Sequence, residues 1–92
     1  MERARLRATV HGDVQGVGFR YFVLRRAEAA RLSGWVRNRP DGSVECLAEG
    51  PRPDLEALLE ELRRGPRMAS VERVEVDWES AQGDLPGFGL RG

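Results

Sequence analysis

Residues 10–20, Val-His-Gly-Asp-Val-Gln-Gly-Val-Gly-Phe-Arg, contain the residue types that bind a phosphate group. The glycines allow backbone N–H groups to converge on one point and form an anion-binding nest. A helix beginning at Phe19 would add the positive end of its dipole, and Arg20 would add a permanent, forked cation. We therefore predict a phosphate or sulfate cradle. The loop composition by itself also fits a tight structural turn with a surface arginine.

Two well-known nucleotide loops do not match this stretch. Its glycines, at 12, 16 and 18, do not follow G-x-G-x-x-G, and no Gly-Lys-Ser/Thr sequence follows them. The cradle is therefore not predicted to bind a nucleotide.

A second stretch, residues 34–45, contains Asn38, the only asparagine in the chain. Asn38 ends a predicted strand, where its carboxamide offers both a donor and an acceptor to a group outside the sheet. Asparagine is also common at the start of a turn, and the pattern alone leaves that interpretation open.

Taken together, the two stretches resemble the signature motifs of the acylphosphatase family. In that family a G-x-V-Q-G-V-x-F-R loop is followed, eighteen residues after its Arg, by the Asn of a G-W-V-x-N strand; Arg20 and Asn38 hold these positions here. The Gly-Ser-Val-Glu run at 42–45 and the closing Phe-Gly-Leu-Arg at 88–91 also match, so the resemblance covers essentially the whole chain. Two departures are Ala30-Arg31, where the family has Leu-Gly, and the missing aromatic residue after Arg91.

This resemblance implies a small free-standing acylphosphatase, which hydrolyses acyl phosphates to a carboxylate and inorganic phosphate. The implied catalytic residues are Arg20 and Asn38, with Asn38 positioning the attacking water. The implied phosphate-binding groups are the Arg20 side chain and the backbone amides of the loop, which consists of Gln15, Gly16, Val17, Gly18, Phe19 and Arg20. Inorganic phosphate and sulfate are expected to compete with the substrate.

The residues themselves agree with this chemistry. The departing carboxylate is a weak base, with a pKa near 4, so it leaves without a proton donor. Neither motif offers an obvious acid, base or nucleophile, so positioning and charge stabilisation would have to carry the reaction. A phosphate oxygen of the substrate is then the expected proton acceptor. One His and one Cys far apart in the chain predict no metal site and no cofactor.

The elements that must position these residues follow from periodicity. Alternation predicts strands at 5–10, 35–38, 44–48 and 74–78, and spacings of three and four predict helices at 19–32 and from about 53 to 64. A short strand is predicted at 88–91. The order is that of an α+β, ferredoxin-like βαββαβ sandwich: a single domain over 1–92, two helices on one face of an antiparallel sheet, the other face polar and open.

Composition limits the alternatives. Fifteen arginines balance fifteen acidic residues, and there is no lysine. Zero net charge argues against a nucleic-acid or membrane binder, because such proteins usually carry a basic excess. A single cysteine, Cys46, and the absence of a signal-like or spanning apolar run favour the reducing cytoplasm. The family precedent predicts a monomer.

Four further residues are assigned structural roles. His11 is expected to be structural or solvated, and Cys46 and Trp78 are expected to fill the core. Trp35 shares a face with Arg37, where it would either pack on the open side of the sheet or shield the edge of the site. Two rival functions remain. One is an RNA-binding sheet carrying Arg5, Arg7 and Arg37, although Glu45 and Glu49 share that face. The other is an accessory unit like the one that begins hydrogenase-maturation carbamoyltransferases, which carry further domains.

Overall fold

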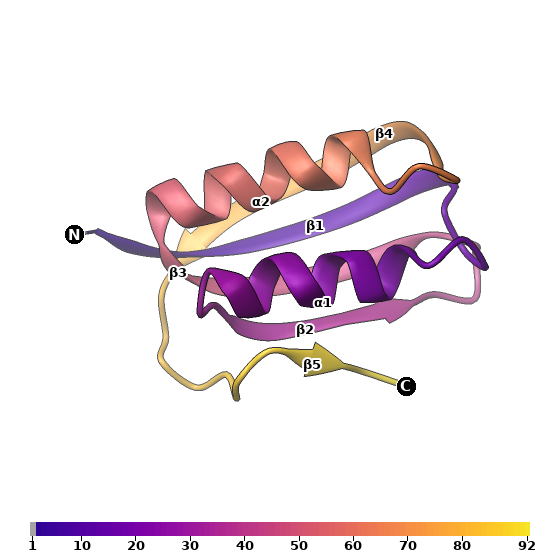
Figure 1. Ribbon diagram of the computed structural model, residues 1–92. Coiled ribbons are helices and arrows are strands. Elements are labelled where there is room, and N and C mark those ends of the chain that lie inside the picture. Colours follow the sequence, from indigo (N-terminus) through magenta and orange to yellow (C-terminus); the bar gives the residue numbers. More distant parts are fainter. Residues whose placement is uncertain (1) are drawn as a thin grey trace.

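The structure, a computed structural model, describes residues 2–92. Its elements follow the predicted order: β1 (Arg3–Asp13), α1 (Phe19–Ala29), β2 (Ser33–Asn38), β3 (Val44–Pro51), α2 (Arg52–Arg64), β4 (Ser70–Ser80) and β5 (Gly89–Leu90). The strands form one sheet in the order β4-β1-β3-β2-β5, and both helices cover the same face of it (Figure 1). The ferredoxin-like α+β fold is therefore confirmed.

The sheet is mixed rather than purely antiparallel. β1 pairs antiparallel with both β3 and β4, and β2 pairs antiparallel with β3, as predicted. β5 runs parallel to β2, with Trp35 opposite Gly89 and Val36 opposite Leu90. The chain reaches β5 through a long connection from β4 that crosses the end of the sheet, and this return sets the parallel direction (Figure 1).

The core lies between the sheet and the helices. β1 contributes Leu6, Ala8 and Val10, each fully buried, as its alternation predicts. α2 contributes the leucine stripe, Leu55, Leu58, Leu59 and Leu62, and the burial of each leucine side chain is worth about 1.5–3 kcal/mol. Cys46 is fully buried, as expected, whereas Trp78 is only half-buried and packs at the edge of the core.

β1 and β4 are longer than their side-chain alternation predicts. β1 continues to Asp13 and β4 begins at Ser70, because these two strands pair along nearly their whole length. A bulge between His11 and Gly12 shifts their register. At this point Gly12 has φ 132°, and a Cβ there would lie 2.2 Å from the carbonyl oxygen of Ser70. Backbone pairing thus extends strands beyond the residues that alternate.

The prediction that the second sheet face is open was wrong at its centre. Glu45, Leu47 and Glu49 of β3 point to that face, yet all three are buried. Glu49 accepts hydrogen bonds from Arg5 Nε at 2.7 Å and from the backbone N–H groups of Gln82 and Gly83, both at 2.9 Å. The loop after β4 therefore lies across this end of the face and is fastened to the central strand.

Candidate active site

The predicted cradle loop joins the end of β1 to the start of α1. Val14 is buried and anchors it, and Gly16 and Gly18 have φ of 75° and 78°, a left-handed conformation that favours glycine. The first helical hydrogen bond runs from the Phe22 N–H to the Gly18 carbonyl, at 3.0 Å. The N–H groups of the preceding helical residues therefore have no acceptor within the helix and can bind an anion.

Arg20 and Asn38 lie at the same small cavity, although they belong to different elements. Arg20 is in the first turn of α1 and Asn38 is the last residue of β2. The cavity has a volume of about 140 Å³ and is lined by Val14, Gly16, Gly18, Phe19, Arg20, Tyr21 and Asn38. Two of the predicted phosphate-binding residues, Gln15 and Val17, are not among its lining residues.

The charge of the cavity comes from Arg20. Within residues 2–92, its guanidinium forms no ion pair, so its hydrogen-bond donors are available to a bound anion. The lining contains no carboxylate, histidine or thiol among the described residues. The arrangement can bind an anion and orient a water molecule, but it provides no carboxylate or imidazole to take a proton.

Gln15 connects the cradle to the strand that carries Asn38. Its Nε2 donates to the carbonyl oxygens of Arg39, at 2.7 Å, and Ser43, at 2.9 Å. These two carbonyls belong to the β2–β3 turn, which begins directly after Asn38. The family resemblance implied a phosphate contact from the Gln15 backbone amide, but it did not indicate this role of the side chain, because no pattern in the sequence shows that the loop faces this turn.

The turn itself is stabilised by Asp41. Its Oδ1 accepts from the Ser43 hydroxyl at 2.6 Å and from the Ser43 N–H at 3.0 Å. These two hydrogen bonds, helped by the charge of Arg39, hold the pKa of Asp41 below its ordinary value. Asp41 is therefore a turn residue and remains ionised, with its preferred hydrogen-bond donors already engaged.

Tyr21 is a site residue that the sequence analysis missed. It lines the cavity beside Arg20 while remaining 55% exposed. The sequence did contain a sign of this role. Tyr21 is a large aromatic residue directly after the motif arginine, and it occupies a helical position off the apolar stripe.

The remaining candidates lie outside the cavity. His11 Nε2 is 2.7 Å from Glu75 Oε1 across the β1–β4 pair, in agreement with a structural role. Burial raises the pKa of the Cys46 thiol to about 12, so Cys46 is not a nucleophile. Trp35 is half-buried beneath the guanidinium groups of Arg37 and Arg91, which lie 5.4 and 4.7 Å from its ring centre.

Over residues 2–92, no three His, Cys, Asp or Glu side chains are placed to hold a metal ion together. In the same part of the chain, no helix has the length and apolarity needed to cross a membrane.

The fold and the cavity define a small ferredoxin-like domain with a glycine-rich loop and a small cavity at a helix N-terminus. Comparison with known proteins places it more narrowly. The family model described as "Acylphosphatase" matches residues 6–90. The acylphosphatase of Salinibacter ruber is 52% identical over 87 residues, which cover 95% of this chain and 92% of that protein. The chain belongs to the acylphosphatase family.

Solved structures agree with this result. The crystal structure of acylphosphatase from Bacillus subtilis has a TM-score of 0.92 and 39% identity, and the match covers 97% of this chain and 99% of that one. Full-length HypF, in its phosphate- and nucleotide-bound form, matches with a TM-score of 0.85 and 26% identity. That match covers 99% of this chain but only 12% of HypF.

Proposed function

We propose that this protein hydrolyses small acyl phosphates by attack of water on phosphorus, without a metal ion. The observation that carries the proposal is the shared cavity of Arg20 and Asn38 at the N-terminus of α1. Membership of the acylphosphatase family supports acyl phosphate as the substrate class. The cavity volume of about 140 Å³ suits a single phosphate group with the acyl chain extending outside.

In this mechanism the substrate phosphate lies in the cradle. The N–H groups of the loop and of the first turn of α1, together with Arg20, bind its oxygens and stabilise the charge that develops in the transition state. Because the guanidinium is a planar fork, Arg20 holds two phosphate oxygens at once. The side chain of Gln15 does not take part, since both of its amide hydrogens are donated to the neighbouring turn.

Asn38 orients the attacking water on the other side of the cavity. The new P–O bond forms to this water while the bond between phosphorus and the acyl oxygen breaks. The carboxylate leaves with its electron pair, and a phosphate oxygen takes the proton of the water, so the products are R–COO⁻ and H₂PO₄⁻. The carboxamide of Asn38 is too weak a base to take this proton.

The test is phosphate release from benzoyl phosphate, with and without a chelator, in the parent and in Arg20→Ala. We expect a chelator-insensitive rate that falls at least about 10²–10³-fold in the variant, the usual cost of losing one preorganised donor. Inorganic phosphate and sulfate should inhibit the parent competitively. Restoration of a chelated enzyme by a divalent ion, or noncompetitive inhibition, would contradict the proposal.

The RNA-binding alternative has little support on the second sheet face. Arg7 and Arg37 both pair with Glu45, and Arg5 pairs with Glu49 and Asp84. Their positive charge is therefore locally balanced, which leaves little to attract a phosphate backbone. A monomeric state and a cytoplasmic location stay predictions, which gel filtration and cell fractionation would test.

A further inference from the structure

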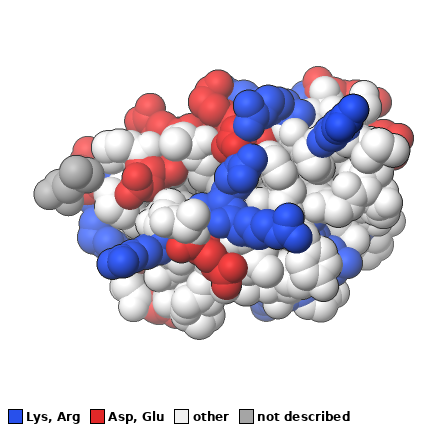
Figure 2. Space-filling model, in the orientation of Figure 1, with Lys and Arg blue, Asp and Glu red and all other residues white. Residues whose placement is uncertain are grey.

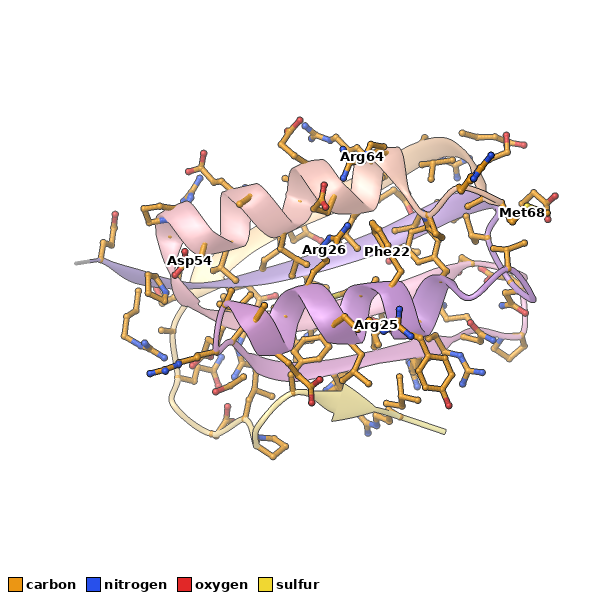
Figure 3. The ribbon with its side chains drawn as sticks, viewed as in Figure 1. Phe22, Arg25, Arg26, Asp54, Arg64 and Met68 are labelled. Atoms are coloured by element: carbon orange, nitrogen blue, oxygen red, sulfur yellow. The ribbon has the colours of Figure 1, made fainter. Side chains whose placement is uncertain are left out.

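A groove rich in arginine lies between the start of α1 and the end of α2. It consists of two adjoining cavities of about 450 and 520 Å³, both lined by Phe22, Arg26 and Pro66. Arg25 lines the first cavity, and Arg64 and Arg67 line the second. We call this surface the arginine groove. In Figure 3, Phe22 and Arg26 project from α1 toward α2, and Arg64 lies on α2.

The arginine groove has an excess of positive charge in a chain that is neutral as a whole. No carboxylate is among the residues that line either cavity. Glu61 of α2 balances part of the charge: it accepts a hydrogen bond from Arg26 Nε at 2.6 Å and also pairs with Arg64. Basic side chains accordingly gather in the middle of the helix-covered face (Figure 2).

Two of the four arginines that line the groove differ from the other two in their ion pairing. In the part of the chain that the structure describes, Arg25 and Arg67 form no ion pair, whereas Arg26 and Arg64 are both held by Glu61. Paired arginines offer fewer free donors to an incoming anion. Arg25 and Arg67 are therefore the cations best able to bind one, and Arg25 is the one in the cavity that also includes Gly18 and Tyr21.

The arginine groove also adjoins the phosphate cradle. Gly18 and Tyr21 line both the cradle cavity and the first groove cavity. Tyr21, which is 55% exposed, is therefore an aromatic side chain at the junction of the two sites. Within the groove, the Phe22 ring lies 4.7 Å from the Arg26 guanidinium. A ligand with a phosphate at one end, a short aliphatic chain and an anion at the other end matches this sequence of surfaces.

We propose that the arginine groove selects acyl phosphates whose acyl chain ends in a second anion, and that Arg25 binds that anion. The selected group is a carboxylate or a second phosphate, since a guanidinium binds both in the same forked manner. The proposal rests on the proposed function and narrows its substrate class. Arg25 acts in specificity only, because the chemistry takes place at Arg20 and Asn38.

The first test compares kcat/KM for succinyl phosphate, which carries a distal carboxylate, with kcat/KM for benzoyl phosphate, which carries none. Arg25→Gln should lower the value for succinyl phosphate about fivefold, as expected for one charge-assisted contact at an exposed site. It should leave the value for benzoyl phosphate within twofold. Arg3→Gln is the matched control, because Arg3 is exposed at the opposite end of β1 and its loss changes the net charge equally.

The possible outcomes separate the two proposals. Loss confined to succinyl phosphate in Arg25→Gln supports the arginine groove. Equal changes for both substrates, or the same change in Arg3→Gln, would overturn it while leaving acyl phosphate hydrolysis intact. A parent that hydrolyses neither substrate would overturn the proposed function itself.

A second test measures binding without turnover. The inhibitors are alkylphosphonates that end in a methyl group, a carboxylate or a second phosphonate, with chains of two to five methylenes. We expect the anionic ends to bind more tightly at one chain length, with the gain reduced by high salt and lost in Arg25→Gln. The carboxylate and phosphonate series distinguish the two kinds of distal anion. Equal inhibition by all three ends at every length would overturn the proposal.

Discussion

Asn38 reaches the cradle from the end of a strand, whereas Arg20 reaches it from the first turn of a helix. The two side chains would therefore contact a bound phosphate from two different secondary-structure elements. Their side chains also differ in chemistry: the guanidinium is a permanent cation, while the carboxamide is neutral and both donates and accepts. This difference makes each role testable by a substitution that conserves size.

For Asn38, an isosteric change separates two mechanisms. In Asn38→Asp a carboxylate would help if a base were needed, but it should hurt beside a dianionic phosphate. Two like charges about 4 Å apart cost on the order of 4 kcal/mol at an effective dielectric constant of 20. We expect Asn38→Asp to be no more active than Asn38→Ala. We also expect phosphate to bind Asn38→Asp more weakly, which a larger inhibition constant would show. Measured kcat in the Asp variant equal to the parent would show that a base acts there.

For Arg20, replacement by lysine keeps the charge and removes the fork. An ammonium group cannot contact two phosphate oxygens in the guanidinium geometry, so Arg20→Lys should lose at least about tenfold in kcat/KM for benzoyl phosphate. Circular dichroism would check the fold. A variant with parental turnover would mean that Arg20 acts as a point charge only.

The backbone is strained just after the C-terminal end of α1. Arg31 has φ 57° and is the only non-glycine residue with positive φ in the described chain. Its N–H donates to the Glu28 carbonyl at 3.0 Å, and the Leu32 N–H donates to the Ala27 carbonyl at 2.9 Å, which is the Schellman pattern. The helix thus ends at Ala29, earlier than its periodicity predicts, through a turn that favours glycine at position 31.

Replacing Arg31 by glycine should therefore stabilise the protein. A non-glycine residue in the left-handed region costs about 1 kcal/mol, so Arg31→Gly should raise the free energy of unfolding by about 0.5–1 kcal/mol in a urea titration. Arg31→Ala keeps the Cβ and should bring no such gain. Stabilisation by both variants would instead assign the effect to the guanidinium.

The contact between the cradle loop and the β2–β3 turn depends on Gln15. Gln15→Met keeps the volume and removes both donated hydrogen bonds, so the cradle and Asn38 should lose their fixed separation. Small misplacements of reacting groups cost up to about 10²-fold, and we expect kcat to fall about tenfold or more. The inhibition constant for phosphate should stay within about twofold. A phosphate affinity reduced as strongly as in Arg20→Ala would show that Gln15 contacts the anion after all.

For the whole molecule, Glu49 joins the central strand to β1 and to the loop that leads to β5. Burial by itself raises the pKa of Glu49, but hydrogen bonds from the Gln82 and Gly83 N–H groups and from Arg5 outweigh it and hold the pKa below its ordinary value of 4.5. A carboxyl whose pKa is lowered by folding stabilises the protein above its unfolded pKa. That contribution is lost as the pH falls through the lower, folded value.

We therefore expect stability to fall as the pH drops below about 4.5, and Glu49→Gln to weaken this acid dependence. At pH 7 the variant should lose about 2–3 kcal/mol, because Arg5 would lose its buried charged partner and keep only the exposed carboxylate of Asp84. Glu60→Gln is the control, since its pair with Arg63 is exposed and contributes little. An unchanged stability in Glu49→Gln would show that the buried pair does not hold the loop.

Residue type and local periodicity were enough to predict the two motifs, the order of the elements and the apolar faces of β1 and α2, because each of these depends on neighbours close in the sequence. The prediction that Arg20 and Asn38 belong to one site came from the resemblance of the two motifs to the acylphosphatase family, because composition and spacing alone left both residues open to structural roles. Three contacts between distant segments appear only in the tertiary structure: Gln15 with the turn after Asn38, Arg5 and Glu49 with the loop after β4, and Arg26 of α1 with Glu61 of α2. Such contacts depend on how the sheet and the helices pack against each other, so they cannot be predicted from the residues that are adjacent in the sequence.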